Sequence, residues 1–275
     1  MAILDVHHVG IAVRSMEAAY AFYRDALGLP LVKEGVVESR GVRAAMLGVG
    51  RSYLEVLEPF TEESPFARHI AERGEGLHHL ALWSDDIEGD VERLRDLGVA
   101  LADRRPRVGF TGRLSYLAPA AFDGALLEVV QPEAGLTGGQ PRPGHISRTD
   151  HVVLRVPDAR AVSERFLAYL GVPTKRTMGR GAHQFAFMRP GDVVIEVIGP
   201  KAGGEPGTGR IAGLAFEVTG IDELAASLRA RGYPAGEPHP ALQGGRIASV
   251  HHSGACGVPV AFIDFTDNAS ASRSG

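Results

Sequence analysis

The sequence predicts an α+β fold in which four β-α-β-β-β modules pair into two tandem domains. Four segments share one pattern, which is a short apolar strand, a polar turn and an amphipathic helix that stops at glycine. They read VHHVGIAVRSMEAAYAFYRDALGLP, LHHLALWSDDIEGDVERLRDLGVA, TDHVVLRVPDARAVSERFLAYLGVP and IAGLAFEVTGIDELAASLRARGYP. In the first three copies the strand histidine and the cap glycine lie 20, 19 and 20 residues apart: His8 and Gly28, His79 and Gly98, His151 and Gly171. Unrelated α+β pieces would not produce such matched spacings, so the segments are interpreted as copies of one unit.

Strand-like runs follow each helix and complete the modules. In chain order they are VRAAMLGV and SYLEVLEP, RLSYLAP and GALLEVVQ, HQFAFMRP and DVVIEVIGP, RIASVHH and VPVAFIDF. The segment PEAGLTGGQPRPGHIS is rich in Gly and Pro and has no periodicity, which is typical of a linker. We therefore expect a first domain at residues 1–131, a linker at 132–147, a second domain at 148–266 and a disordered tail at 267–275.

Composition narrows the class of function. The chain has 275 residues, a formal charge of −4 and 44% apolar residues, so a nucleic-acid partner is not expected. No apolar run reaches the roughly 18 residues of a membrane helix. The N-terminus lacks a secretory pattern, and Cys256 is the only cysteine. These features predict a cytoplasmic protein without a membrane partner.

The first strand combines a histidine with small residues on one face. Alternation with a period of two places His8, Gly10 and Ala12 together, whereas His7 and the bulky residues at 9, 11 and 13 lie on the other face. The second module repeats this division, with His79 and Ala81 on one face. His8 and His79 are therefore expected at equivalent positions on an open face, and His7 and His78 are not.

Two carboxylates occupy matching places in the last strands of the same modules. Glu55 interrupts an apolar run 47 residues after His8, and Glu128 interrupts another 49 residues after His79. Two neutral imidazoles and two carboxylates suit a divalent transition metal, with Co, Ni, Zn, Mn and Fe all possible. An ion would also offset the cost of carboxylates in apolar surroundings. We predict His8, Glu55, His79 and Glu128 as its ligands, and no other cofactor.

At these residues the chain resembles the vicinal oxygen chelate superfamily, which includes glyoxalases, bleomycin resistance proteins and dioxygenases. The N-terminal half is most similar to the methylmalonyl-CoA epimerase branch, on the stretches HHVGIAV, EPFTEESPFARHIAERGEGLHHLAL and GALLEVVQ. The resemblance covers about residues 4–131 and implies the same four ligands. It also implies a metal that chelates substrate oxygens and stabilises an enolate, and a small oxygenated acid or acyl thioester as substrate.

Three departures from the epimerase pattern bear on the chemistry. Where such epimerases have an acid/base Glu, GVRAAML has Ala44, and where they have His-Pro-Lys this chain has Ala118, Pro119 and Ala120. Their residue at the Glu55 position is often Gln, and the His-Glu-His-Glu set is similar to that of bacterial glyoxalase I. Two-base epimerisation needs groups on opposite sides of the carbon, and Ala44 supplies none.

These observations favour a metal-dependent isomerase or epimerase that transfers a proton next to a carbonyl. A one-base shuttle needs only Glu128 or Glu55, which are our candidate catalytic residues. A glyoxalase I-like lyase, an extradiol-type dioxygenase and a non-catalytic small-molecule binding protein remain as alternatives.

The second domain is predicted to be a degenerate copy. Its equivalent positions are His151, Glu196, Gly213 and Ala261, so two of the four ligands are lost. We expect no catalytic ion there. Exposed sheet edges also allow a homodimer.

Overall fold

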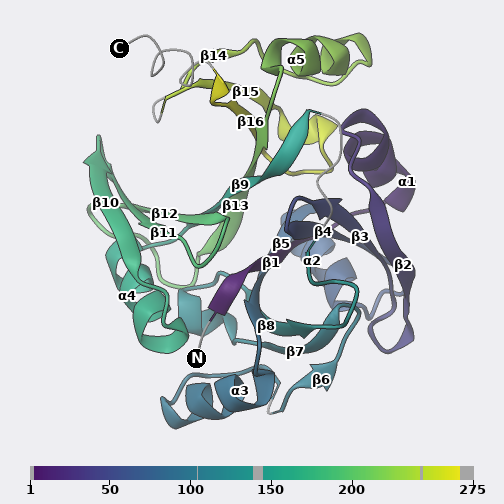
Figure 1. The fold of residues 1–275 in the computed structure, drawn as a ribbon. Helices are drawn as coiled ribbons and strands as arrows, with labels where there is room; N and C mark the ends of the chain where they lie inside the picture. The colour runs from purple at the N-terminus through teal and green to yellow at the C-terminus, as the bar shows by residue number, and fades with distance from the viewer. Residues whose placement is uncertain (1–2, 104, 139–144, 242–243, 267–275) are drawn as a thin grey trace. The chain divides into compact units, whose positions relative to one another are not determined.

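The computed structural model describes residues 3–103, 105–138, 145–241 and 244–266 (Figure 1). The predicted tail and residues 139–144 of the predicted linker lie outside the described residues. The strands form two curled eight-stranded sheets, and each draws on two modules. The predicted α+β fold of four repeated modules is confirmed, whereas the domain boundaries stay a prediction.

The first sheet has the strand order β2-β3-β4-β1-β5-β8-β7-β6. The first module contributes β1 (Ile3–Ala12), α1 (Met16–Ala19), a π-helical segment (Tyr20–Ala26), β2 (Leu31–Val37), a 3-10 turn (Glu38–Arg40), β3 (Val42–Val49) and β4 (Ser52–Pro59). Helix α2 (Pro65–Arg73) follows. The second module contributes β5 (Gly76–Ser84), α3 (Ile87–Asp96), β6 (Arg107–Val108), β7 (Gly112–Tyr116), a 3-10 turn (Pro119–Phe122) and β8 (Leu127–Pro132).

The second sheet repeats the arrangement as β10-β11-β12-β9-β13-β16-β15-β14. The third module contains β9 (Ile146–Arg155), α4 (Ala159–Leu170), β10 (Thr174–Arg180), β11 (His183–Met188) and β12 (Val194–Pro200). The fourth contains β13 (Arg210–Val218), α5 (Ile221–Ala230), β14 (His239–Pro240), β15 (Arg246–Val250), a 3-10 turn (His252–Gly254) and β16 (Val260–Asp264).

The cap glycines behave as the sequence predicts. Gly28, Gly98, Gly171 and Gly232 have φ angles of 76°, 73°, 67° and 84°, which is the left-handed region that glycine enters without steric cost. The first helix differs from the expected regular α-helix, since its second half winds as a π-helix in which Leu27 N–H donates to the Phe22 carbonyl at 3.0 Å. The wider turn still buries Phe22 and Tyr23.

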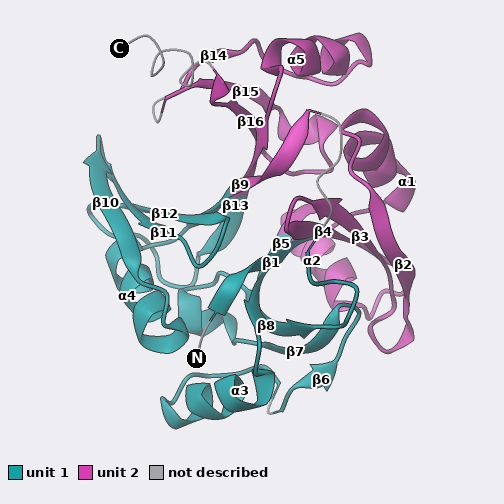
Figure 2. Cartoon of the chain, viewed as in Figure 1, with its two compact units in different colours: residues 1–10, 78–138, 151–212 teal, residues 11–77, 139–150, 213–275 magenta. Residues whose placement is uncertain are grey.

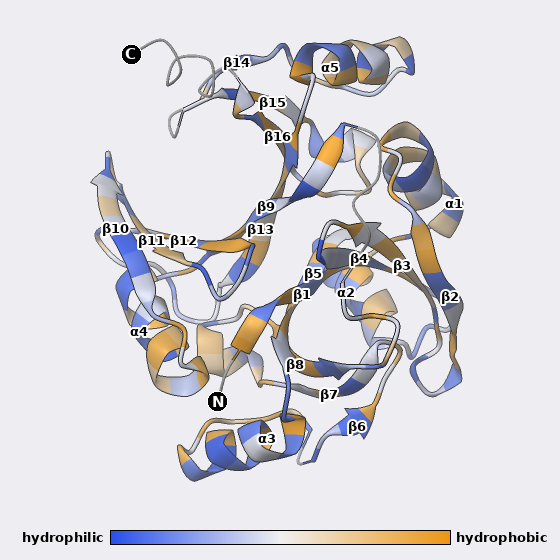
Figure 3. Cartoon of the chain, viewed as in Figure 1, coloured by the Kyte–Doolittle hydropathy of each residue, from blue (hydrophilic) through white to orange (hydrophobic). Residues whose placement is uncertain are grey.

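The helices are amphipathic and cover the sheets with one apolar stripe. In Figure 3, α3 and α5 carry hydrophilic and hydrophobic residues in alternation along their length. In α3 the buried residues Ile87, Val91 and Leu94 follow helical spacing. Each such side chain contributes about 1.5–3 kcal/mol when fully buried.

The chain also forms two compact units (Figure 2). One unit contains residues 1–10, 78–138 and 151–212. Within it, the Phe122 and Phe166 rings lie 4.9 Å apart. The Asp5 carboxylate accepts a hydrogen bond from the Asp192 N–H at 3.0 Å. The other contains residues 11–77, 139–150 and 213–275, and within it Tyr23 donates to the Ala255 carbonyl at 3.0 Å.

Candidate metal centre

Two buried histidines face each other from the middle of strands β1 and β5. The Nε2 atoms of His8 and His79 lie 3.0 Å apart, and both side chains are 0% exposed. Gly10 makes this approach possible, because a Cβ atom there would lie 2.1 Å from Cε1 of His79. His8, Gly10 and the His79 ring therefore share one face, as the alternation in the two strands predicts.

Glu128 extends this pair from strand β8. In the parallel pairing of β5 and β8 it lies beside Ala81, and in the antiparallel pairing with β7 it lies beside Tyr116. Its Oε1 atom is 3.8 Å from His8 Nε2, and its Oε2 atom is 3.8 Å from His79 Nε2. The carboxylate thus spans both imidazoles while only 1% exposed.

Glu55 also lies close to the histidine pair. It lies on β4, opposite Met46 of β3, and is 6% exposed. Among the described residues, His8, Glu55 and His79 each offer a ligand atom, and these atoms lie within 4.8 Å of one another. The cluster could therefore bind a metal ion, as predicted. The ligand role of each side chain stays a prediction.

The donor set fits a divalent cation. Two nitrogens that bind one ion at 2.0–2.1 Å in neighbouring positions are about 2.9–3.4 Å apart, and the observed separation is 3.0 Å. Two carboxylates at 1% and 6% exposure carry a desolvation cost that a cation would offset. Imidazole and carboxylate together suit the first-row transition metals.

The walls beside the cluster are apolar and aromatic. Ala81, Leu114 and Val130 form a buried group against which Tyr116 packs. The Tyr116 ring also meets the His79 ring edge-on, with 5.4 Å between centroids. Such walls lower the local dielectric and strengthen electrostatic interactions at the cluster.

The sequence reasoning missed the roles of His7 and His78. It excluded them from the open face, but their rings contact the rings of His8 and His79. His7 Nδ1 lies 2.7 Å from His8 Nδ1, and His78 Nδ1 lies 3.0 Å from His79 Nδ1. The doubled histidine in both strands was the available signal, because a metal-binding histidine almost always has a partner on its other nitrogen.

The hydrogen bonds around His7 define the tautomer of His8. A carbonyl oxygen can only accept, so His7 Nε2–H donates to the Leu136 carbonyl at 2.8 Å. The Nδ1 atom of a neutral His7 is then an acceptor, and His8 Nδ1–H donates to it. This leaves the lone pair of His8 on Nε2, the atom that faces His79 and Glu128.

Two of the three departures from the epimerase pattern leave positions without an ionisable side chain. Ala44 lies in β3, fully buried and opposite Leu57. Ala118 precedes the short 3-10 turn formed by residues 119–122. These positions cannot replace a second acid/base group.

The second half keeps a partial copy of the cluster. His151 Nε2 lies 3.7 Å from Glu196 Oε2, and both side chains are partly exposed. Gly213 and Ala261, the other two equivalent positions, have no ligand atom in their side chains.

The chain belongs to the glyoxalase/bleomycin resistance protein/dioxygenase superfamily, whose family model matches residues 7–116 and 150–249. Its N-terminal half resembles methylmalonyl-CoA epimerases. The ethylmalonyl-CoA/methylmalonyl-CoA epimerase of Cereibacter sphaeroides is 32% identical over 129 residues, which cover 46% of this chain and 96% of the relative. The uncharacterized protein YqjC of Bacillus subtilis is 35% identical over 127 residues, which cover 46% of this chain and 91% of the relative.

A structural relative covers both halves. A mutant of 4-hydroxymandelate synthase from Streptomyces coelicolor matches with a TM-score of 0.72 over 96% of this chain and 93% of its own. Its sequence is 18% identical, so the match establishes the two-domain fold alone. Superfamily membership and the epimerase relatives together support an enzyme. No helix in the described part of the chain is long and apolar enough to cross a membrane.

Proposed function

We propose that this protein is a metal-dependent enzyme that moves a proton at the carbon next to the carbonyl of an acyl thioester, with His8, Glu55, His79 and Glu128 holding the ion. The convergence of two buried imidazoles and the Glu128 carboxylate carries this proposal. The named activity of the Cereibacter sphaeroides relative supports a substrate of the malonyl-CoA type. The lyase and dioxygenase alternatives lack support of comparable specificity.

Glu128 is the proposed general base. Its two carboxylate oxygens each approach a different imidazole, so one can hold the ion while the other takes the α-proton. The C–H electron pair then moves into the thioester carbonyl as an enolate, and the protonated Glu128 returns the proton to carbon. A bound divalent ion supplies Lewis-acid stabilisation of the negative oxygen. The apolar walls exclude water and strengthen this stabilisation.

Ala44 makes a one-base course the expected one. Ala44 stands at the position that would act from the opposite side of the carbon, and its side chain is a buried methyl group. A single carboxylate that removes and redelivers the proton on one face gives exchange with retention of configuration. Inversion requires either a second base or reorientation of the enolate.

Deuterium exchange tests the proposal directly. The protein is loaded in turn with Co²⁺, Ni²⁺, Zn²⁺, Mn²⁺ or Fe²⁺ and incubated in D2O with methylmalonyl-CoA or ethylmalonyl-CoA. Mass spectrometry should show a gain of one deuterium at the α-carbon well above the rate without protein. Exchange at the background rate with every metal and both substrates would refute the assignment. An E128Q protein that still binds metal is the matched control and should not exchange.

A further inference from the structure

A small basic hollow lies at the ends of strands β9, β11 and β12, within the compact unit that contains residues 151–212. Its volume is about 250 Å3. Arg155 is the last residue of β9, His183 the first of β11, and Arg210 the first of β13. Their side chains line the hollow together with Thr208. The strand pairing places Arg155 and His183 on either side of the end of β12, since Ile198 pairs with Arg155 and Pro200 pairs with His183.

The charges that line this hollow are all positive. No aspartate or glutamate is among the lining residues. In the described part of the chain neither the Arg155 nor the Arg210 guanidinium has an ion-pair or hydrogen-bond partner. The neighbouring Asp158 carboxylate is already engaged, because it caps α4 by accepting from the backbone N–H groups of Arg160 and Ala161. Two like charges at one hollow repel each other unless an anion lies between them.

Glycines shape the hollow by bringing loops close. A Cβ atom on Gly199 would lie 2.8 Å from the Ala159 nitrogen and 2.9 Å from the Val156 carbonyl oxygen. A Cβ atom on Gly204 would lie 3.2 Å from Pro157 Cα. The end of β12 and the segment that follows it therefore pack against residues 156–159 in a way that larger side chains would prevent. Without the glycines the floor of the hollow would be displaced.

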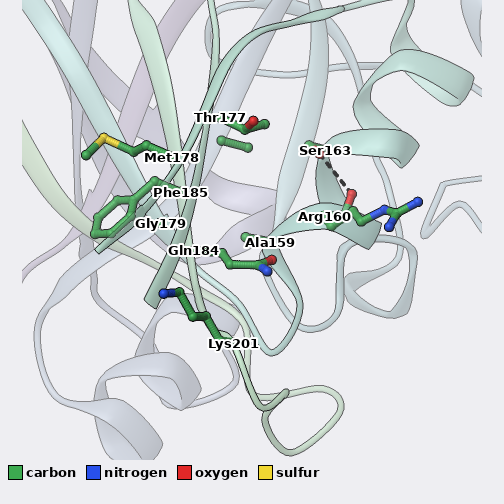
Figure 4. A pocket seen from close by; sticks show the side chains of 10 residues that line it. Ala159, Arg160, Ser163, Thr177, Met178, Gly179, Gln184, Phe185 and Lys201 are labelled. Atoms are coloured by element: carbon green, nitrogen blue, oxygen red, sulfur yellow. Dashed lines mark hydrogen bonds between the residues drawn. The ribbon is translucent and has the colours of Figure 1, made fainter. Parts of the chain in front are cut away.

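A neighbouring pocket shows a contrasting chemistry. It lies between α4 and strands β10 and β11, has a volume of about 470 Å3 and is lined by Phe185, Met178, Gln184 and Lys201 among others (Figure 4). Its arginine, Arg160, pairs with Glu164 at 2.9 Å, so its charge is already compensated. The other cation of this pocket, Lys201, has no ion-pair partner among the described residues, whereas the smaller pocket brings together two such cations, Arg155 and Arg210.

We propose that Arg155, His183, Thr208 and Arg210 form a binding site for a phosphate group. Two guanidinium forks match the oxygens of a tetrahedral dianion, and the imidazole adds a donor. The Thr208 hydroxyl donates to the Glu205 carbonyl at 2.7 Å and therefore only lines the site. The volume admits a phosphate together with part of a molecule that carries it. The ligand is either free phosphate or a phosphate-bearing compound such as a coenzyme A derivative, and the chemistry of recognition is the same. This site shares no residue with the His/Glu cluster.

Calorimetric titration at constant ionic strength separates these sources. Inorganic phosphate, coenzyme A and pantetheine are titrated into the wild-type protein, an R155Q/R210Q double variant and an R160Q control. The affinity for phosphate or coenzyme A should be at least 10-fold weaker in the double variant than in the wild-type protein. The R160Q control should keep the wild-type affinity. Pantetheine, which has no phosphate, should not bind at this site. Coenzyme A binding far more tightly than phosphate identifies an ester ligand, whereas equal affinity identifies the free anion.

Three outcomes would contradict the proposed phosphate site. The first is that neither phosphate nor coenzyme A binds to the wild-type protein. The others are that the double variant binds as tightly as the wild-type protein, or that R160Q weakens binding as much as the double variant does. Circular dichroism and the melting temperature confirm that each variant is folded. Treatment with a chelator should leave the phosphate affinity unchanged. That result keeps this test independent of the proposed metal-dependent activity.

Discussion

The Nδ1 atom of His7 lies 2.7 Å from the Nδ1 atom of His8, and the other nitrogen of His7 is bonded to the Leu136 carbonyl. A backbone carbonyl thereby determines, through one imidazole, which nitrogen of the next imidazole is available. Because the rings are 0% exposed, water does not compete for these bonds. His7 is thus a positioning residue for His8, and the predicted ligand atom is Nε2.

Replacement of His7 by Phe should weaken metal binding without removing a ligand. The H7F ring leaves the Leu136 carbonyl and His8 Nδ1–H without their shared partner, so His8 is free to rotate or change tautomer. Loss of such outer contacts typically costs 10–100-fold in metal affinity. Competition titration with a coloured chelator measures the change.

The controls for this prediction use amide and exposed-site variants. H7Q keeps one donor and one acceptor and should retain most of the affinity. His239 is exposed on β14, so H239F should have no effect. Equal metal affinity in H7F and H239F would contradict the role of His7.

Amide variants should distinguish the role of the Glu128 carboxylate from that of the Glu55 carboxylate. E128Q keeps the shape of the side chain but removes the base, so α-deuterium exchange should fall by about 10²–10⁴-fold. E55Q should bind metal more weakly yet retain exchange once it is saturated with metal, because an amide oxygen is still a ligand. Metal content by mass spectrometry and exchange rates at saturating metal check both expectations. The opposite pattern would identify Glu55 as the base.

The repeated fold could be read from strand and helix periodicity, whereas the contacts within the histidine pairs could not. Strand runs, helical spacing and cap glycines such as Gly28 and Gly171 are local signals, and the structure follows them. Period-two alternation also placed His8 and His79 on one face. It treats His7 and His78 only as residues of the opposite face, because side-chain torsions that bring neighbouring rings together leave no periodic trace. The π-helical segment at 20–26 was likewise not predicted, since the apolar spacing of this stretch indicates only an amphipathic helix.

A methyl group added at Gly10 should disrupt the cluster of His8, Glu55 and His79. Its Cβ would lie 2.1 Å from the His79 ring, so the imidazole must move. G10A should therefore lose metal affinity by at least 10-fold and lower the melting temperature. Gly236 is the matched control, because its nearest neighbour would be 3.6 Å away and G236A should bind metal normally. Unchanged metal binding in G10A would show that the His79 ring does not need this position.

Cys256 should be unreactive in the folded protein. Burial, with a smaller contribution from the Glu75 carboxylate, raises the pKa of its thiol to about 12. At pH 8 only roughly one molecule in ten thousand then carries the nucleophilic thiolate, whereas an unfolded chain with a cysteine pKa near 8.5 has about a quarter. A disulfide reagent that releases a coloured thiolate should report no fast reaction in native protein and one thiol per chain in denaturant. An E75Q variant should stay unreactive, because desolvation is the larger cause. Rapid stoichiometric labelling of the native protein at pH 8 would contradict the buried position of this side chain.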